Sequence, residues 1–440
     1  MTIAIAILGP AALAGGPADA ETAEPHPAAI ALSWDEARQR AEAASGLVRR
    51  AWAERQVVQA RRVGAELLFP SNPVVALQGG YRREDGVAGE RAEGRPVAAH
   101  LEQTLEVAGQ RSTRRAQVER EIEAATWRER VALVEVWARA RATYVGVQLA
   151  DAQVQAAARR VVLVERLLEG VRARVESGAA STVDLELARV EEGQARRAHL
   201  TAGLGRATAE TELRALLALE PGVPVVLRTP LGRPAGWSAG VAPVGGGPSD
   251  PLDRSRLSEL LGKARAQRAE LRALASSGQA LDAELTRLTR EAVPNPTLFI
   301  DAGRDLPGQV FVGAGLAIPL PVWRRNQGER ATNRAERQLV SVEAAVTERE
   351  IDAEVERALR TVMTEGEIVR TWESLVLPAA ESAVELITEG WRAGKFDLFR
   401  VIQASRDASE ARRGHLESLG DLWQASIGLA RAVGSPPDSE

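Results

Sequence analysis

The 440-residue sequence contains no cysteine and few aromatic residues. Without cysteine we expect no disulfide, no thiolate metal ligand, no cysteine nucleophile and no lipid carried on an N-terminal cysteine. Five Phe and two Tyr are too few for the interior of a compact enzyme of this length, which normally packs many large rings. Burial must come from Ala, Leu and Val between helices, which favours long helices packed side by side.

An excess of positive charge is also missing. The formal net charge is -4, and the charged residues, 26% of the chain, have both signs interspersed, so no basic face for nucleic-acid phosphates is expected. None of the four histidines has the spacing of a metal ligand; they are His26, His100, His199 and His415. We therefore expect no catalytic residue, no cofactor, no metal site and no nucleic-acid partner.

Long apolar runs are absent except at the N-terminus. Residues 3–13 are mostly apolar and are followed by Ala18-Asp19-Ala20, a pattern typical of signal-peptide cleavage, although a basic n-region is missing. We predict a signal peptide over residues 1–20. The run is too short for a membrane helix of about 20 residues, so a membrane crossing would have to be made by β-strands.

The chain repeats one order of segments. A helical stretch over 32–68 runs into Pro70-Ser71-Asn72-Pro73, and a second one over 257–292 runs into Pro294-Asn295-Pro296. Proline lacks a backbone N–H and pushes the residue before it out of the α region, so each Asn-Pro ends a helix and begins extended structure. Both halves are therefore predicted to change from helix to strand by the same device.

Each Asn-Pro is followed by two stretches that read as a strand pair. The predicted pairs are 73–82 with 96–107 and 296–304 with 309–318. In the stretch 97–107 apolar and polar residues alternate over a length that matches a transmembrane β-strand of about nine to eleven residues. From alternation alone, a soluble hairpin with one wet face fits equally well.

A very long helical region follows each second strand. At 1.5 Å per residue, about 65 residues form a rod of roughly 100 Å. Each rod ends at a glycine and a second helix returns, so antiparallel helical hairpins are predicted over 109–219 and 326–433. Pro378 should kink or interrupt the second rod.

These segments divide the chain into two similar halves. The predicted units are a signal peptide (1–20), a first structural repeat (21–220), a Gly/Pro-rich linker or equatorial segment (221–252), a second structural repeat (253–433) and a flexible tail (434–440).

Short motifs in these segments resemble a known family. The transition through Asn-Pro shortly after another proline, given twice, resembles the repeat of the TolC family of outer-membrane channel proteins. Residues 318–328 (IPLPVWRRNQG) are similar to the "PLP…RNQG" segment of its heavy-metal-efflux, CzcC-like branch, and 105–111 (LEVAGQR) to its "E-x-x-GKR" counterpart. Gln110 stands where lysine is usual. The resemblance covers essentially the whole mature chain.

The resemblance implies a mainly α fold with a small β part. Long antiparallel α-helical hairpins would form an α-barrel, and four transmembrane β-strands per chain would close as a trimeric 12-stranded β-barrel. The four strands of one chain could not close a barrel alone, because small barrels need about eight strands and an open sheet edge is not viable in lipid. Assembly of several copies is therefore expected, in agreement with a trimer. The implied location is the outer membrane of a Gram-negative bacterium, with a long periplasmic extension.

The function implied by the resemblance is that of a passive exit duct in a tripartite efflux pump, with heavy-metal cations as cargo and no enzymatic activity. The implied partners are two further copies in a homotrimer, a periplasmic adaptor protein, an inner-membrane transporter of the resistance-nodulation-division type and outer-membrane lipid.

The resemblance also assigns a site to the turns of the two helical hairpins, where the periplasmic tip docks the adaptor and forms the entrance. The candidate residues are Gly178, Asp184, Gly394, Lys395, Asp397 and Arg400. Glycine can end a long helix in the left-handed conformation, and a side chain such as that of Asp397 can cap the returning helix, so capping alone also accounts for these residues. Arg400 stands where the family often has an acid.

Two other functions remain open from the sequence. One is a TolC-type channel for drugs or secreted proteins, because the motifs specific to the metal branch are short. The other is a coiled-coil scaffold of the cell envelope that transports nothing. The duplicated strand pairs favour a channel, since a scaffold has no need of them.

Overall fold

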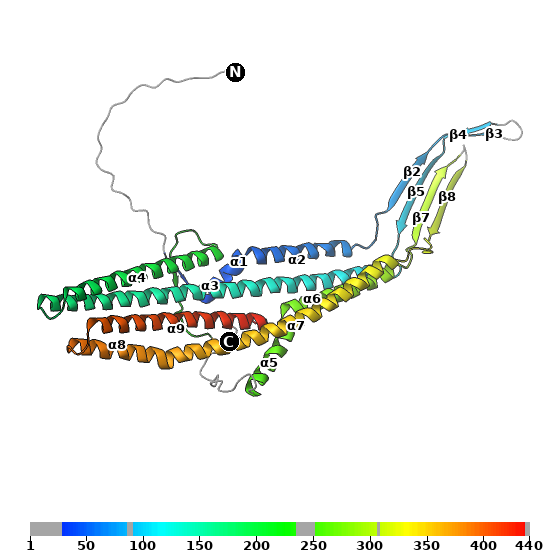
Figure 1. Cartoon of the computed structure of the whole chain (residues 1–440). Coiled ribbons are helices and arrows are strands. Elements are labelled where there is room, and N and C mark those ends of the chain that lie inside the picture. The colour runs from blue at the N-terminus through cyan, green and yellow to red at the C-terminus, as the bar shows by residue number, and fades with distance from the viewer. Residues whose placement is uncertain (1–28, 86–90, 235–250, 306–308, 436–440) are drawn as a thin grey trace, which may run out of the picture.

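The computed structural model describes residues 29–85, 91–234, 251–305 and 309–435. Long helices lie side by side, and a small sheet projects from one end (Figure 1). The mainly α fold with a small β part is therefore confirmed. The signal peptide predicted over 1–20 lies outside the described residues.

In the part of the chain that the structure describes, no helix combines the length and the apolar character needed to cross a membrane.

The first half of the chain contains most of the strands and the longest helix. Its elements are β1 (Ile30–Leu32), α1 (Trp34–Ala44), α2 (Gly46–Ala65), β2 (Val74–Gly79), β3 (Arg82–Asp85), β4 (Arg91–Gly94), β5 (Val97–Thr104), α3 (Gln110–Glu176), α4 (Thr182–Leu216) and β6 (Val225–Leu227).

The second half repeats the order of helices and strands. Its elements are α5 (Pro251–Gln267), α6 (Ala269–Glu291), β7 (Thr297–Arg304), β8 (Val310–Ala317), α7 (Gln327–Thr371), the π-helical turn η1 (Trp372–Val376), α8 (Leu377–Arg392) and α9 (Leu398–Val433).

The helical stretches predicted over 32–68 and 257–292 are each interrupted once. Ser45 separates α1 from α2 and Arg268 separates α5 from α6, and both residues adopt an extended ψ of 121°. Ser45 caps α2 through its side chain. Arg268 is buried, and its guanidinium contacts Glu354 (3.0 Å) and the carbonyl oxygens of α9. The bends therefore depend on a local cap in one half and on a tertiary contact in the other.

Two pairs of short strands lie outside the predicted strand pairs. β1 pairs in parallel with β6, which lies within the segment 221–252 expected to be a linker. Tyr144 of α3 is buried beside this pair, and its hydroxyl donates to the Leu32 carbonyl (3.2 Å). β3 and β4 form a hairpin beyond the main sheet, within the predicted connection between the strands 73–82 and 96–107 (Figure 1).

The second rod is interrupted near Pro378, as its sequence predicts. Proline cannot donate to the carbonyl four residues earlier, and just before it the Leu377 N–H reaches back to the Trp372 carbonyl in a π-type bond. The indole of Trp372 donates to Ser418 of α9 (3.0 Å) and lies against Gly414, where a Cβ would come within 2.7 Å of the ring. The wider turn is therefore fixed to α9.

The main sheet is antiparallel, with strand order β2-β5-β7-β8. Its centre joins the two halves of the chain, because β5 pairs with β7 from Val97 opposite Arg304 to Thr104 opposite Thr297. β2 and β8 are the two edges. The sheet is thus one unit built equally from both halves, with two free edges in the single chain.

Candidate functional site

One face of the main sheet is apolar and exposed on all four strands. Leu77 on β2 and Val312 on β8 are each 77% exposed. Side chains alternate between faces along a strand, and the register keeps the apolar ones together. Gln103 and Arg304, near the ends of their strands, also lie on this face. Its apolar side chains are Val75, Leu77, Val97, Ala99, Leu101, Leu298, Ile300, Ala302, Val310, Val312, Ala314 and Leu316. A face of this kind needs an apolar surrounding.

The opposite face of the sheet is polar at its centre. The His100 ring lies 2.6 Å from Asp301 on β7 and 3.3 Å from Glu102 on its own strand. The hydroxyls of Thr104 and Thr297 lie 3.0 Å apart. Within the described ranges, no group of three or more His, Cys, Asp or Glu side chains is arranged to hold a metal ion. The polar groups of this face mainly satisfy one another.

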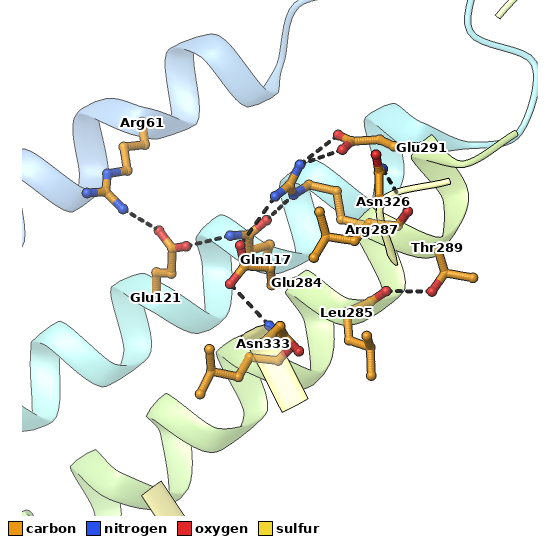
Figure 2. A network of polar contacts seen from close by, with 12 residues as sticks. Arg61, Gln117, Glu121, Glu284, Leu285, Arg287, Thr289, Glu291, Asn326 and Asn333 are labelled. Atoms are coloured by element: carbon orange, nitrogen blue, oxygen red, sulfur yellow. Dashed lines mark hydrogen bonds and ion pairs between the residues drawn. The ribbon is translucent and has the colours of Figure 1, made fainter. Parts of the chain in front are cut away.

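A polar network joins the helices just below the sheet (Figure 2). Arg61 of α2 donates to Glu121 of α3 (3.0 Å), and Gln117 donates to the same carboxylate (2.8 Å). Gln117 in turn accepts from Arg287 of α6 (2.6 Å). The amide of the buried Asn333 on α7 donates to a carbonyl and a carboxylate of α6. These bonds hold four helices in one arrangement beneath the sheet.

The turns of the two helical hairpins lie at the same end of the molecule, opposite the sheet (Figure 1). Both long helices end in the same way. Gly178 has φ 76° and Gly394 has φ 74°, and the next residue donates to the carbonyl of Arg174 (2.7 Å) or Gly390 (2.8 Å). This is the Schellman arrangement, which only glycine adopts without strain.

The returning helices are capped by the acidic residues of the predicted site. Ser181 and Asp184 form a reciprocal capping box at the start of α4, and Asp397 accepts from the Arg400 N–H (3.1 Å) at the start of α9. The Arg400 guanidinium lies over the Phe396 ring, 5.4 Å from its centroid. Both Asp184 and Asp397 are therefore engaged in caps. Lys395, directly after Gly394, is exposed.

Two residues that the sequence analysis missed join the tips of the hairpins. Arg174 of α3 donates to the Arg392 carbonyl at the end of α8 (2.8 Å) and lies 4.2 Å from the centroid of the Trp391 ring. Trp391 belongs to a buried cluster with residues of α3, α4 and α9. A basic residue in the last turn of a helix is a capping signal, but it does not reveal which helix end the residue serves.

Each tip also presents an exposed apolar side chain at the start of its returning helix. Val183 and Phe399 are the second residues of α4 and α9, and they are 65% and 62% exposed. Their equivalent positions in the two tips can be read from the sequence, whereas their exposure cannot. The two tips therefore offer apolar contact area beside the glycine turns.

A buried carboxylate connects the two hairpins further up the bundle. Glu191 of α4 is fully buried and pairs with Arg160 of α3 (2.5 Å) and Arg406 of α9 (2.6 Å). Removing one partner from such a group leaves an uncompensated buried charge. The hairpins are thus fixed relative to each other by charge as well as by the apolar cluster at the tip.

A sequence model of the outer membrane efflux protein family matches residues 35–219 and 260–435. The match covers most of both halves, and the chain therefore belongs to the outer membrane efflux protein family. This result confirms the resemblance to the TolC family drawn from the Asn-Pro and RNQG motifs.

Individual relatives agree with this assignment. The cobalt-zinc-cadmium resistance protein CzcC of Cupriavidus metallidurans is 26% identical over 350 residues, which cover 78% of each protein. The structure of CusC matches with a TM-score of 0.68 at 16% identity, covering 91% of this chain and 92% of that one. The outer membrane protein VceC of Vibrio cholerae matches with a TM-score of 0.66 at 14% identity, covering 92% and 97%. The structural matches show a shared fold.

Membership of this family also bears on the chemistry. Its members are passive efflux channels of the outer membrane. The chain is accordingly an outer-membrane efflux protein and not an enzyme.

Proposed function

We propose that three copies of this chain form the exit duct of a tripartite efflux pump, with heavy-metal cations as its cargo. The observation that carries the proposal is the sheet, which has an exposed apolar face and two free edges in the single chain. Unpaired strand edges are not viable in lipid. Three copies supply twelve strands, enough to close the sheet into a ring.

In this assembly the apolar face of the sheet contacts outer-membrane lipid and the polar face lines the duct. The long helices then extend into the periplasm, and the hairpin of β3 and β4 faces the cell exterior. Bands of apolar side chains on the outside and polar ones inside are typical of membrane-spanning sheets. The alternating faces of β5, with Leu101 outward and His100 inward, support this orientation.

The tips of the hairpins are proposed to dock a periplasmic adaptor and to form the entrance to the duct. A trimer gathers six such turns in one ring, so each side chain there is repeated by symmetry. The proposed docking residues are Gly178, Asp184, Gly394, Lys395, Asp397 and Arg400, to which the exposed Val183 and Phe399 are added as apolar anchors. Apolar side chains surrounded by polar groups are typical of contact sites.

Two observations support metal cations as cargo and a transporter of the resistance-nodulation-division type as the source of energy. The RNQG motif resembles the metal branch, and the relative CzcC is a cobalt-zinc-cadmium resistance protein. On the polar face of the sheet, carboxylates such as Glu102 and Asp301 would favour the passage of cations. No binding site for metal is needed, because a duct conducts without selecting.

The cargo is tested in a host strain from which the corresponding channel gene has been deleted. We expect the chain, produced with its own adaptor and transporter, to restore growth in cobalt, zinc or cadmium salts. Restored growth in organic drugs but not in metal salts would instead show a drug channel. No restoration of either, with normal trimers in the outer membrane, would contradict a role in efflux.

The docking site is tested by Gly394→Val. A β-branched residue at φ 74° costs about 1 to 3 kcal/mol locally and reshapes the turn, while the sheet lies at the other end of the molecule. We expect inserted trimers that no longer cross-link to the adaptor and no longer support efflux. The matched control is Gly193→Val on α4, where a Cβ meets no atom within 4 Å and φ is not positive. A destabilised Gly394→Val trimer that still cross-links to the adaptor would show that the glycine is only a cap.

A further inference from the structure

The two halves of the chain use one device where each second strand enters its long helix. Gly109 before α3 and Asn326 before α7 are both left-handed, with φ 73° and 56°. The next residue in each case is a glutamine whose side-chain oxygen accepts the backbone N–H two residues earlier. The distance is 2.9 Å for Gln110 and 2.7 Å for Gln327. The two junctions are therefore structurally equivalent.

The nitrogen ends of the two glutamines have different surroundings. Nε2 of Gln110 donates to Oδ1 of Asn295 in the other half of the chain (2.7 Å), and Gln110 is only 1% exposed. Gln327 is exposed, and its Nε2 turns back to the carbonyl of Trp323 (2.7 Å). Gln110 thus forms a hydrogen bond to the other half of the chain, here called the clasp, whereas Gln327 forms no such bond to the residues that the structure describes.

The acceptor of the clasp, Asn295, also has an equivalent in the first half of the chain. Asn295 lies in the Asn-Pro step between α6 and β7, and Asn72 lies in the Asn-Pro step between α2 and β2. Asn72 is exposed, and its amide makes no hydrogen bond to any residue that the structure describes. Within the described part of the single chain, therefore, neither Gln327 nor Asn72 makes the contact between halves that Gln110 makes.

We propose that Gln327 of one copy binds Asn72 of the next copy, in the way that Gln110 binds Asn295 within the chain. The proposal rests on the trimer proposed above, and it adds the residues and the register of the contact between copies. Each copy would then form this hydrogen bond within itself and also with its neighbour.

The ends of the strands set the pairing of the free edges. The glutamines do not, because Gln110 follows the last residue of β5 by six positions and Gln327 follows the last residue of β8 by ten. Within the chain the Leu105 N–H donates to the Pro296 carbonyl (2.9 Å), and Gln103 stands opposite Leu298. When β8 is matched to β5 and β2 to β7 by these ends, Leu316 of β8 lies opposite Val75 of the next copy. This register keeps apolar residues on the apolar face, whereas a slip by one residue would turn them to the polar face.

The helices below the sheet follow the same pattern. α3 packs against α6 within the chain, so α7 is expected to pack against α2 of the next copy. Ala125 on α3 is 4% exposed, whereas the equivalent Val342 on α7 is 53% exposed. The exposed Leu339 and Val346 lie beside Val342, and Val57 and Val63 are exposed on α2. These side chains supply the apolar area that a stable contact requires.

The register is tested by disulfide formation, for which the cysteine-free chain needs no prior modification. Directly opposite residues of an antiparallel pair are close enough for a disulfide. We expect L316C combined with V75C to link separate copies, giving dimers and trimers on a non-reducing gel. L101C with I300C, opposite each other within the chain, should form a disulfide and remain monomeric on the gel. Linking of L316C to L77C instead would show a two-residue slip and overturn the proposed register.

The clasp is tested by the dissociation rate of the native trimer. Gln327→Ala and Asn72→Ala should each raise this rate about fivefold for each clasp broken, the effect of one hydrogen bond. The double variant should be no faster than either single one, because both remove the same contact. Additive effects in a trimer that forms normally would overturn the clasp. A wild-type chain that forms no trimer would contradict the proposed function itself, so the two failures are distinguishable.

Discussion

The sheet end and the tip end of the molecule differ in where their large apolar side chains lie. On the sheet, residues such as Leu77 and Val312 face outward and are largely exposed. At the tip, Val171, Trp391 and Leu398 are enclosed between the two hairpins. In the proposed assembly the sheet end would depend on lipid and on further copies for its stability, whereas the tip is packed within one chain.

Among changes that test this difference between the two ends, Trp391→Ala at the tip is expected to have the largest effect on stability. Loss of a buried Trp costs about 3 to 5 kcal/mol, and Arg174 would lose the ring on which it lies. We expect faster hydrogen exchange in the last turns of α3 and α8 and faster proteolysis near Gly178. Trp52→Ala on α2 is the matched control, since Trp52 is half exposed and α2 lies away from the tip (Figure 1). Equal exchange at the tip in both variants would mean that the tip is not independently packed.

A somewhat smaller effect is expected at the sheet, for Val312→Arg. A charge on the lipid-facing side near the midplane costs about 2 to 4 kcal/mol, so the yield of inserted trimers should fall. Gly313→Arg is the control on the same strand, because Gly313 lies on the opposite face with open space beside it. Quantitative immunoblots of outer-membrane fractions compare the two. Equal yields would remove the assignment of the apolar face to lipid.

The smallest effect is expected for Ser181→Ala at the start of α4. The substitution removes a side-chain cap and its capping box, which costs about 1 kcal/mol. The sheet should be unaffected, because the change is confined to the tip. Hydrogen exchange of the first turn of α4, with the first turn of α9 as an internal control, measures the difference. Accelerated exchange in both helices would show that the tips unfold together, which would sharpen the role of Arg174 in joining them.

The parts of the fold that the sequence predicted depend on local chemistry. The Asn-Pro steps at Asn72 and Asn295 lead directly into strands because proline pushes the residue before it toward extended structure. Gly178 and Gly394 end the long helices because glycine adopts a left-handed conformation without strain. Pro378 indicated the interruption of the second rod for a similar reason. Each of these signals acts within a few residues and can be read without knowing the fold.

The parts that the sequence did not predict depend on contacts between distant segments. The bend at Arg268 rests on Glu354 and on carbonyl oxygens of α9. β1 pairs with β6, which follows the first helical hairpin in the sequence. At the candidate site, the positions of the six predicted residues followed from the turns, but the contact of Arg174 with Trp391 did not. No local pattern specifies which surfaces meet, and the role of the tips in docking stays a prediction.

The pairing of β5 with β7 also determines an order of events during folding. Thr104 and Thr297, which face each other in the sheet, are 193 residues apart in the chain. Helical hairpins form from neighbouring segments and are fast, whereas pairings across long separations are slow. We therefore expect the helical hairpins to form before β5 pairs with β7. Until the second half arrives, β2 and β5 have an unpaired edge and an exposed apolar face, which are features that promote aggregation. The yield of folded protein should accordingly depend on how well its strands are protected from aggregation during folding.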